Sequence, residues 1–96
     1  MNKYIAEFLG TLFFLYVILA VTARTSNPLH DAIPIAVGLA IPIMIFGAIS
    51  GGNFNPAVSV MMVAKGSLRS SDLLPYIVAQ IAGGLVALEL YKRVKF

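Results

Sequence analysis

The chain has 96 residues, 59% of them hydrophobic and 11% charged. This composition excludes an ordinary water-soluble domain, because a soluble monomer rarely exposes so much apolar surface. With no cysteine, one histidine and four carboxylates, the chain lacks the residues for a disulfide framework, a metal site or a hydrolytic centre, so we expect no enzymatic activity and no cofactor. The formal net charge of +3 comes from basic residues beside apolar runs, which is typical of membrane-flanking charges and not of a nucleic-acid groove.

The first predicted element is a membrane-spanning helix over 4–23, a run whose only charge is Glu7. At about 1.5 Å per residue, this run reaches roughly 30 Å, the thickness of the hydrocarbon core. Lys3 before the run also fits a secretory signal peptide, but the run is too long for one and no small-residue cleavage site closes it. We therefore expect a retained span. The polar stretch 24–31, with its Asn-Pro dipeptide, is predicted to be a short loop.

Two further spans are predicted after this loop. The second covers 33–49 and contains no charge, with Pro34 in the first turn, where a missing N–H costs nothing. The third covers 73–91; residues 70–72 (Ser-Ser-Asp) are candidates to cap its start, and Pro75 fits its first turn.

A stripe of small residues runs along the third span. Ala79, Gly83 and Ala87 recur every four residues, so they lie on one face of the helix. Small residues are frequent in membrane helices in general, but this regular spacing favours close packing against another helix.

The segment 50–72, SGGNFNPAVSVMMVAKGSLRSSD, decides the functional prediction. Asn55 is a good N-cap, Pro56 suits the first helical position, and Gly66 suits the left-handed residue after a helix end. The enclosed helix over 56–65 is about 15 Å long, half a bilayer, and mostly apolar. We therefore predict a re-entrant half-helix that follows an extended glycine-rich piece. The alternative, a surface turn, would be more polar.

A re-entrant half-helix predicts a pore for uncharged solutes. Irregular backbone is tolerated at membrane depth only inside protein or beside a water-filled cavity, so the carbonyls of 51–54 need water or hydroxyl partners. The helix N-terminus carries about half a positive charge near Asn55, whose amide also donates hydrogen bonds. Such a site repels cations, hydronium included, and offers hydrogen bonds to neutral molecules.

Three segments in chain order resemble the major intrinsic proteins, the family of aquaporins and glycerol facilitators. The segment 50–58, SGGNFNPAV, resembles the family's first Asn-Pro-Ala loop, and 6–11, AEFLGT, resembles the start of its first helix. Ala79-Gln80 followed by Gly83-Gly84 resembles its third helix. The resemblance implies an all-α membrane protein with three transmembrane helices and one re-entrant half-helix, equivalent to one aquaporin repeat. It also implies passive conduction of water and of small neutral solutes such as glycerol.

The resemblance also implies roles for single residues. In the pore, it gives Asn55 as the hydrogen-bond donor to the solute, and Pro56 and Ala57 as the residues that shape the start of the half-helix. It gives Gly51, Gly52 and Asn53 as the residues whose carbonyls line the single file of solute molecules. Glu7 resembles the family glutamate that braces the re-entrant loop from the first helix; the alternative is an interfacial glutamate open to water. Gln80 either holds loop backbone or bridges two helices.

The constriction of the pore departs from the family pattern. Where the family usually carries an arginine after its second Asn-Pro-Ala, both copies here would supply Val58. Counting back along the second span, the family's aromatic position falls near Val37. Without arginine and aromatic side chains, we expect a wider and more apolar constriction that admits glycerol-sized polyols beside water.

The resemblance covers one of the family's two inverted repeats, and one half-helix does not enclose a pore. The expected complement is an identical chain inserted upside down, which gives an antiparallel homodimer and, by analogy with family tetramers, a tetramer of dimers. Dual topology fits the charges, because three basic residues flank one membrane face (Lys3, Lys65, Arg69) and four the other (Arg24, Lys92, Arg93, Lys95). Two alternatives stay open: a dual-topology small-molecule transporter, and half of a heteromeric channel that is inactive alone.

Overall fold

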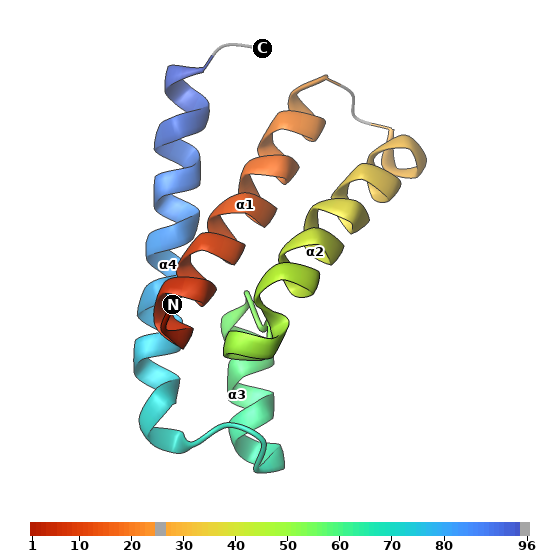
Figure 1. The fold of residues 1–96 in the computed structure, drawn as a ribbon. Coiled ribbons are helices and arrows are strands. Elements are labelled where there is room, and N and C mark those ends of the chain that lie inside the picture. The colour runs from red at the N-terminus through yellow and green to blue at the C-terminus, as the bar shows by residue number, and fades with distance from the viewer. Residues whose placement is uncertain (25–26, 95–96) are drawn as a thin grey trace.

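Figure 1 presents a computed structural model of the chain, which describes residues 1–24 and 27–94. Its helices are α1 (Lys3–Arg24), α2 (Pro28–Ser50), α3 (Pro56–Lys65) and α4 (Ser70–Arg93). Three of them, α1, α2 and α4, are long and apolar enough to cross a membrane, whereas α3 has ten residues and reaches about half as far. This confirms the predicted all-α fold with three membrane-length helices.

Helix α1 is the centre of the arrangement. It packs against α4 on one side and α2 on the other, while α3 packs beside the first half of α4 (Figure 1). The seam between α1 and α4 is close at Gly83, where a Cβ atom would lie 2.6 Å from the carbonyl oxygen of Phe8. Within the small-residue stripe of α4, Gly83 and Ala87 are buried and Ala79 is half-buried. A residue larger than glycine at position 83 would therefore force the two helices apart.

The start of α2 differs from the sequence-based prediction. The helix begins at Pro28, so part of the predicted loop is its first turn and Pro34 lies inside it. The side-chain oxygen of Asn27 accepts hydrogen bonds from two backbone N–H groups of the first turn, at 3.0 and 3.3 Å. Pro28 takes the first helical position, where no N–H is needed. Residues 25–26 of the predicted loop lie outside the described residues.

The start of α4 also differs. Its N-cap is Arg69, whose side chain makes no capping hydrogen bond, and none of the residues 70–72 acts as the cap. The Asp72 carboxylate is instead bound across the seam by two side chains of α1, each at 2.7 Å. Because the helix begins at residue 70, Pro75 lies inside it and not in its first turn.

Candidate functional site

A buried cluster around Glu7 holds the irregular segment 51–55 between α2 and α3, in which Gly51, Gly52 and Phe54 have a positive φ. The Glu7 side chain is fully buried. Its two oxygens accept four hydrogen bonds, from the backbone N–H groups of Asn53 (3.0 Å) and Phe54 (2.8 Å), Oγ of Ser50 (2.7 Å) and Nε2 of Gln80 (2.8 Å). A carboxylate withdrawn from water needs such donors, and all four here are uncharged. The cluster joins α1, the end of α2 and α4 to the segment 51–55.

A second set of hydrogen bonds ties α3 and the end of α2 to α4. Ser59 Oγ accepts from Asn53 Nδ2 at 2.9 Å and from Gln80 Nε2 at 2.8 Å, so Gln80 holds both the glutamate and the half-helix. The Tyr76 hydroxyl donates to the carbonyl oxygen of Ser50 at 2.7 Å. Ser59 and Tyr76 were not singled out by the sequence analysis. One signal was present, because Tyr76 lies four residues before Gln80 and shares its helix face.

Phe54 anchors the segment 51–55 by its side chain. Its φ of 52° lies in the left-handed region, which is uncommon for a bulky residue and carries backbone strain. The ring is buried and lies directly over Gly10 of α1, where an added Cβ atom would overlap it. The absence of a side chain at Gly10 therefore makes room for the ring that fixes the loop.

The backbone N–H and C=O groups of the segment 51–55 differ in their hydrogen bonding. The N–H groups of Asn53 and Phe54 are directed at Glu7. Within residues 1–24 and 27–94, by contrast, no donor reaches the carbonyl oxygens of Gly51, Gly52 or Asn53. The segment thus offers a short row of backbone acceptors that the described chain leaves unused.

The tip of α3 presents a donor at the end of this row. Asn55 is the N-cap of α3, and its Oδ1 accepts the Ala57 N–H at 2.8 Å. Its Nδ2 makes no hydrogen bond in the described part of the chain, and the residue is exposed. Gln80, which contacts the first turns of α3, lies ten residues after the start of α4, about 15 Å along it. The tip therefore lies beside the middle of a membrane-length helix.

A groove of about 400 Å³ between α1 and α4 ends against this tip. Apolar side chains form most of its walls, with Asn55 and Pro56 at one end. Two buried atoms of lining residues, Thr11 Oγ1 and Gln80 Oε1, have no hydrogen-bond partner among the described residues. Val37, by contrast, lies on an exposed part of α2 and does not line this groove.

Comparison with known proteins finds relatives along nearly the whole chain. The profile of the family described as major intrinsic protein matches residues 1–95. The chain is 43% identical to glycerol uptake facilitator protein-like 6 of Lactiplantibacillus plantarum and 38% identical to aquaporin Z of Brucella melitensis, over 91% of the chain in both cases. It is 37% identical to aquaporin-8 of Rattus norvegicus over 92% of the chain. These matches cover 41%, 41% and 35% of the relatives' own lengths, so the chain spans less than half of each. The chain belongs to the major intrinsic protein family.

Proposed function

We propose that this chain forms half of a membrane channel that passively conducts water and small neutral solutes such as glycerol. The observation that carries the proposal is the segment 51–55, in which Glu7 binds the N–H groups of Asn53 and Phe54 while the carbonyls of residues 51–53 have no partner in the described chain. Backbone of this kind is tolerated at membrane depth only where water or protein satisfies it. A file of water molecules or polyol hydroxyls supplies the missing donors.

The proposed path distinguishes neutral from charged solutes. The N-terminus of α3 carries a partial positive charge, which disfavours cations at the tip. Asn55 Nδ2 donates to a passing solute, while the carbonyls of 51–53 accept from it. A solute that both donates and accepts hydrogen bonds, as water and glycerol do, therefore exchanges one set of partners for the other along the path.

The size of the largest conducted solute depends on the side chains at the constriction, which the family resemblance assigns to Val58 and Val37. Val58 lies in the first turn of α3 and is half-buried, while Val37 is 48% exposed on α2. Neither side chain donates a hydrogen bond, and neither fills the space of an arginine or an aromatic ring. Val58 therefore supports a constriction that is wide enough for a small polyol, whereas Val37, which lies outside the groove, is assigned to it by the family resemblance alone.

We assign the other half of the pore to an inverted unit of the same kind, in its simplest form an identical chain in an antiparallel homodimer. The exposed tip of α3 and the uncovered groove are adjacent on one molecule, as a two-fold contact requires. The basic residues divide three against three between the two ends in the described chain, with Lys95 of the predicted four outside it, which supports weak orientation.

Stopped-flow measurements on proteoliposomes that contain only this chain test the proposal. We expect water and glycerol to equilibrate faster than in empty liposomes, with a glycerol flux that rises linearly with concentration. Val58→Trp should return both fluxes to the empty-liposome level. Val86→Trp, on an exposed face of α4 that points away from the groove, is the matched control and should leave them unchanged.

Three results would contradict parts of this proposal. Wild-type flux equal to that of empty liposomes would contradict the homodimer and favour a heteromeric channel. Equal flux in Val58→Trp and wild type would contradict the assigned position of the path. Saturable flux that follows an imposed pH gradient would replace the channel with a transporter.

A further inference from the structure

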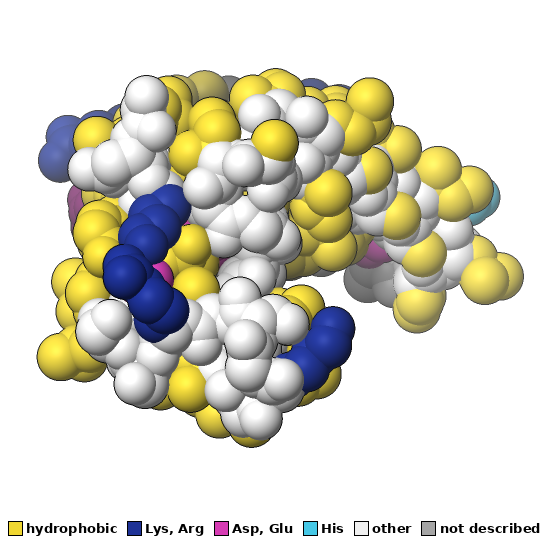
Figure 2. Space-filling view, turned by 60° about the horizontal axis from the view of Figure 1, so that its bottom comes forward, with side chains coloured by type: hydrophobic (Ala, Val, Ile, Leu, Met, Phe, Trp, Pro, Cys, Tyr) yellow, Lys and Arg dark blue, Asp and Glu magenta, His cyan; other side chains and the backbone are white. Residues whose placement is uncertain are grey.

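Within residues 1–24 and 27–94, one end of the molecule carries cations without exposed carboxylates. It is the end where α1 and α4 begin and α3 ends, and we call its charged residues, Lys3, Lys65, Arg69 and Asp72, the basic end. Figure 2 turns this end forward: dark blue Lys and Arg side chains lie across it, with little carboxylate surface between them. The Asp72 side chain is only 4% exposed, whereas that of Arg69 is 76% exposed. The accessible charge here is therefore positive.

The contacts at the basic end leave two of these cations available. Lys3 Nζ lies 2.7 Å from Asp72 Oδ2, so this pair is neutral as a unit. Arg69 approaches the same carboxylate through Nε at 3.5 Å, and its two terminal nitrogens have no partner in the described chain. The exposed ammonium of Lys65 also has no partner there.

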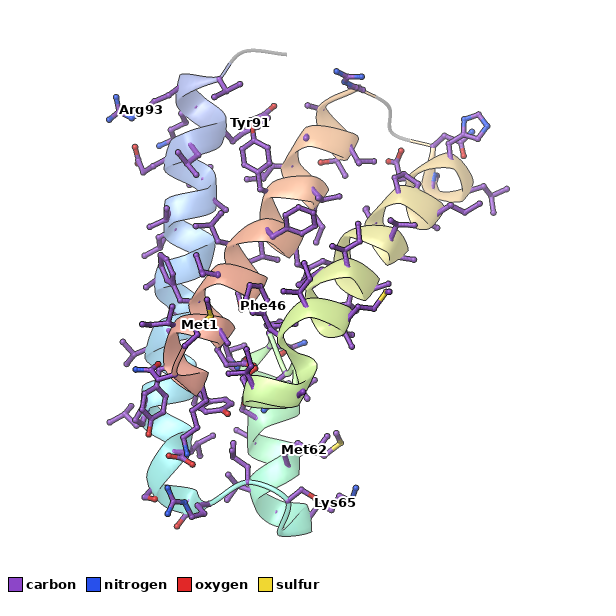
Figure 3. All side chains as sticks on the ribbon, viewed as in Figure 1. Met1, Phe46, Met62, Lys65, Tyr91 and Arg93 are labelled. Atoms are coloured by element: carbon purple, nitrogen blue, oxygen red, sulfur yellow. The ribbon has the colours of Figure 1, made fainter. Side chains whose placement is uncertain are left out.

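The opposite end is arranged differently. Figure 3 shows Lys65 and Arg93 at the two ends of the helical bundle. Around Arg93 an exposed carboxylate accompanies the cations: Glu89 lies 3.7 Å from Lys92 and 3.9 Å from Arg93, and its side chain is 58% exposed. An approaching anion meets a carboxylate beside the cations at that end, but not at the basic end.

We propose that the basic end binds the phosphate groups of anionic lipid headgroups through Lys65 and Arg69. The ends of three membrane-length helices lie at the level of the headgroups, so these cations lie where lipid phosphates are. The free terminal nitrogens of Arg69 suit a phosphate, which a guanidinium binds in a bidentate way, and Lys65 adds a point charge. Exposed hydroxyls of Ser70 and Ser71, directly after Arg69 in the sequence, add neutral donors.

A lipid surface fits these cations better than a free phosphate ion. The cavity beside Lys65, of about 220 Å³, contains no second cation in its lining, so it offers no enclosed anion site. Arg69 lies outside that cavity, and both side chains are exposed. A flat array of headgroups reaches both cations at once. Each basic residue near an anionic membrane surface contributes about fivefold in affinity, so the two together contribute roughly 25-fold.

The chain has no cysteine, so a single introduced thiol reports one end. We would label Ser67→Cys, between the two cations, and Leu29→Cys, which is 82% exposed at the start of α2, with a fluorophore. Each labelled chain is placed in phosphatidylcholine nanodiscs that contain a small fraction of spin-labelled phosphatidylglycerol or spin-labelled phosphatidylcholine as quencher. We expect phosphatidylglycerol to accumulate beside the Ser67 probe with a preference of roughly 25-fold, and much less beside the Leu29 probe.

Variants separate charge from folding in this experiment. Lys65→Gln changes a residue with no partner in the described chain, and it should lower the preference about fivefold. Lys65→Gln with Arg69→Gln should abolish it, while the matched pair Lys92→Gln with Arg93→Gln should not change it at the Ser67 probe. Equal quenching by the two lipids, or a preference that survives the Lys65/Arg69 double variant, would overturn the proposal. Its loss on adding inorganic phosphate at constant ionic strength would indicate a general anion site, and would also overturn it.

Discussion

Two buried carboxylates on the seam between α1 and α4 are satisfied in opposite ways. Glu7 accepts four hydrogen bonds from uncharged donors. Asp72, at the end of the same seam, pairs with Lys3 and accepts a hydrogen bond from Tyr4 at 2.7 Å. The difference follows from access to water. A cation beside Glu7 would also have to be withdrawn from water, whereas Lys3 keeps 31% of its side chain exposed while it contacts Asp72.

The two clusters touch through a pair of aromatic rings. Tyr4, which donates to Asp72, meets Tyr76 edge to face with ring centroids 5.9 Å apart. The Tyr76 hydroxyl in turn holds the carbonyl of Ser50, whose Oγ donates to Glu7. The comparison therefore concerns neighbouring sites that share one seam but differ in chemistry: neutral hydrogen bonds position the loop, and an ion pair joins the helix ends.

The largest effect is expected for Glu7→Gln. The amide keeps one acceptor oxygen but sets its NH₂ group against donors, so buried N–H groups lose their partner at a cost of roughly 3 kcal/mol. Thermal unfolding in mild detergent, followed by circular dichroism, measures this loss. Glu89→Gln, at a 58% exposed side chain, is the matched control and should stay within about 0.5 kcal/mol of wild type. Equal losses of stability in the two variants would contradict the view that the buried hydrogen bonds of Glu7 stabilise the fold more than the exposed Glu89 does.

The helices could be predicted from local sequence patterns, but their starts could be predicted only in part. Asn55-Pro56 was interpreted as an N-cap followed by the first helical residue, and α3 begins in this way. Asn27-Pro28 is the same dipeptide, yet the polar stretch 24–31 around it predicts a loop. The structure starts α2 there. Polarity near a membrane surface thus does not end a helix; the cap chemistry is the better guide.

Family resemblance marks Glu7, Asn55 and Gln80; the structure joins Glu7 and Gln80 in one hydrogen-bonded cluster, and the pore role of Asn55 stays a prediction. The partners that complete the site could not be predicted, because they depend on contacts between distant parts of the chain. Tyr4 and Asp72 are 68 residues apart, and nothing local to either indicates their hydrogen bond. Asp72 was predicted to be a capping residue for the same reason. Its neighbours on α1 take the carboxylate that a cap would need.

A smaller effect is expected for Tyr76→Phe, which keeps the ring and removes one buried hydrogen bond. We expect a loss of about 1 kcal/mol, because the Ser50 carbonyl loses a donor at 2.7 Å. Combining it with Tyr4→Phe sharpens the comparison. The two hydroxyls bond to different clusters, so the double variant should equal the sum of the single effects within about 0.5 kcal/mol. A larger departure from additivity would mean that the two clusters act as one unit.

The smallest effect is expected for Asp72→Asn, and its dependence on salt is the sharpest test of the comparison. The change removes the ion pair but leaves Lys3 and Arg69 in contact with water, so no unpaired charge is buried. At 1 M salt the Debye length is about 3 Å, so partly exposed ion pairs are screened. The loss of unfolding free energy relative to wild type, which we call the deficit of a variant, should therefore shrink for Asp72→Asn. The deficit of Glu7→Gln should not change, because its partners are neutral and buried. Deficits that change in parallel between 0.1 and 1 M salt would show that charge, and not access to water, governs both carboxylates.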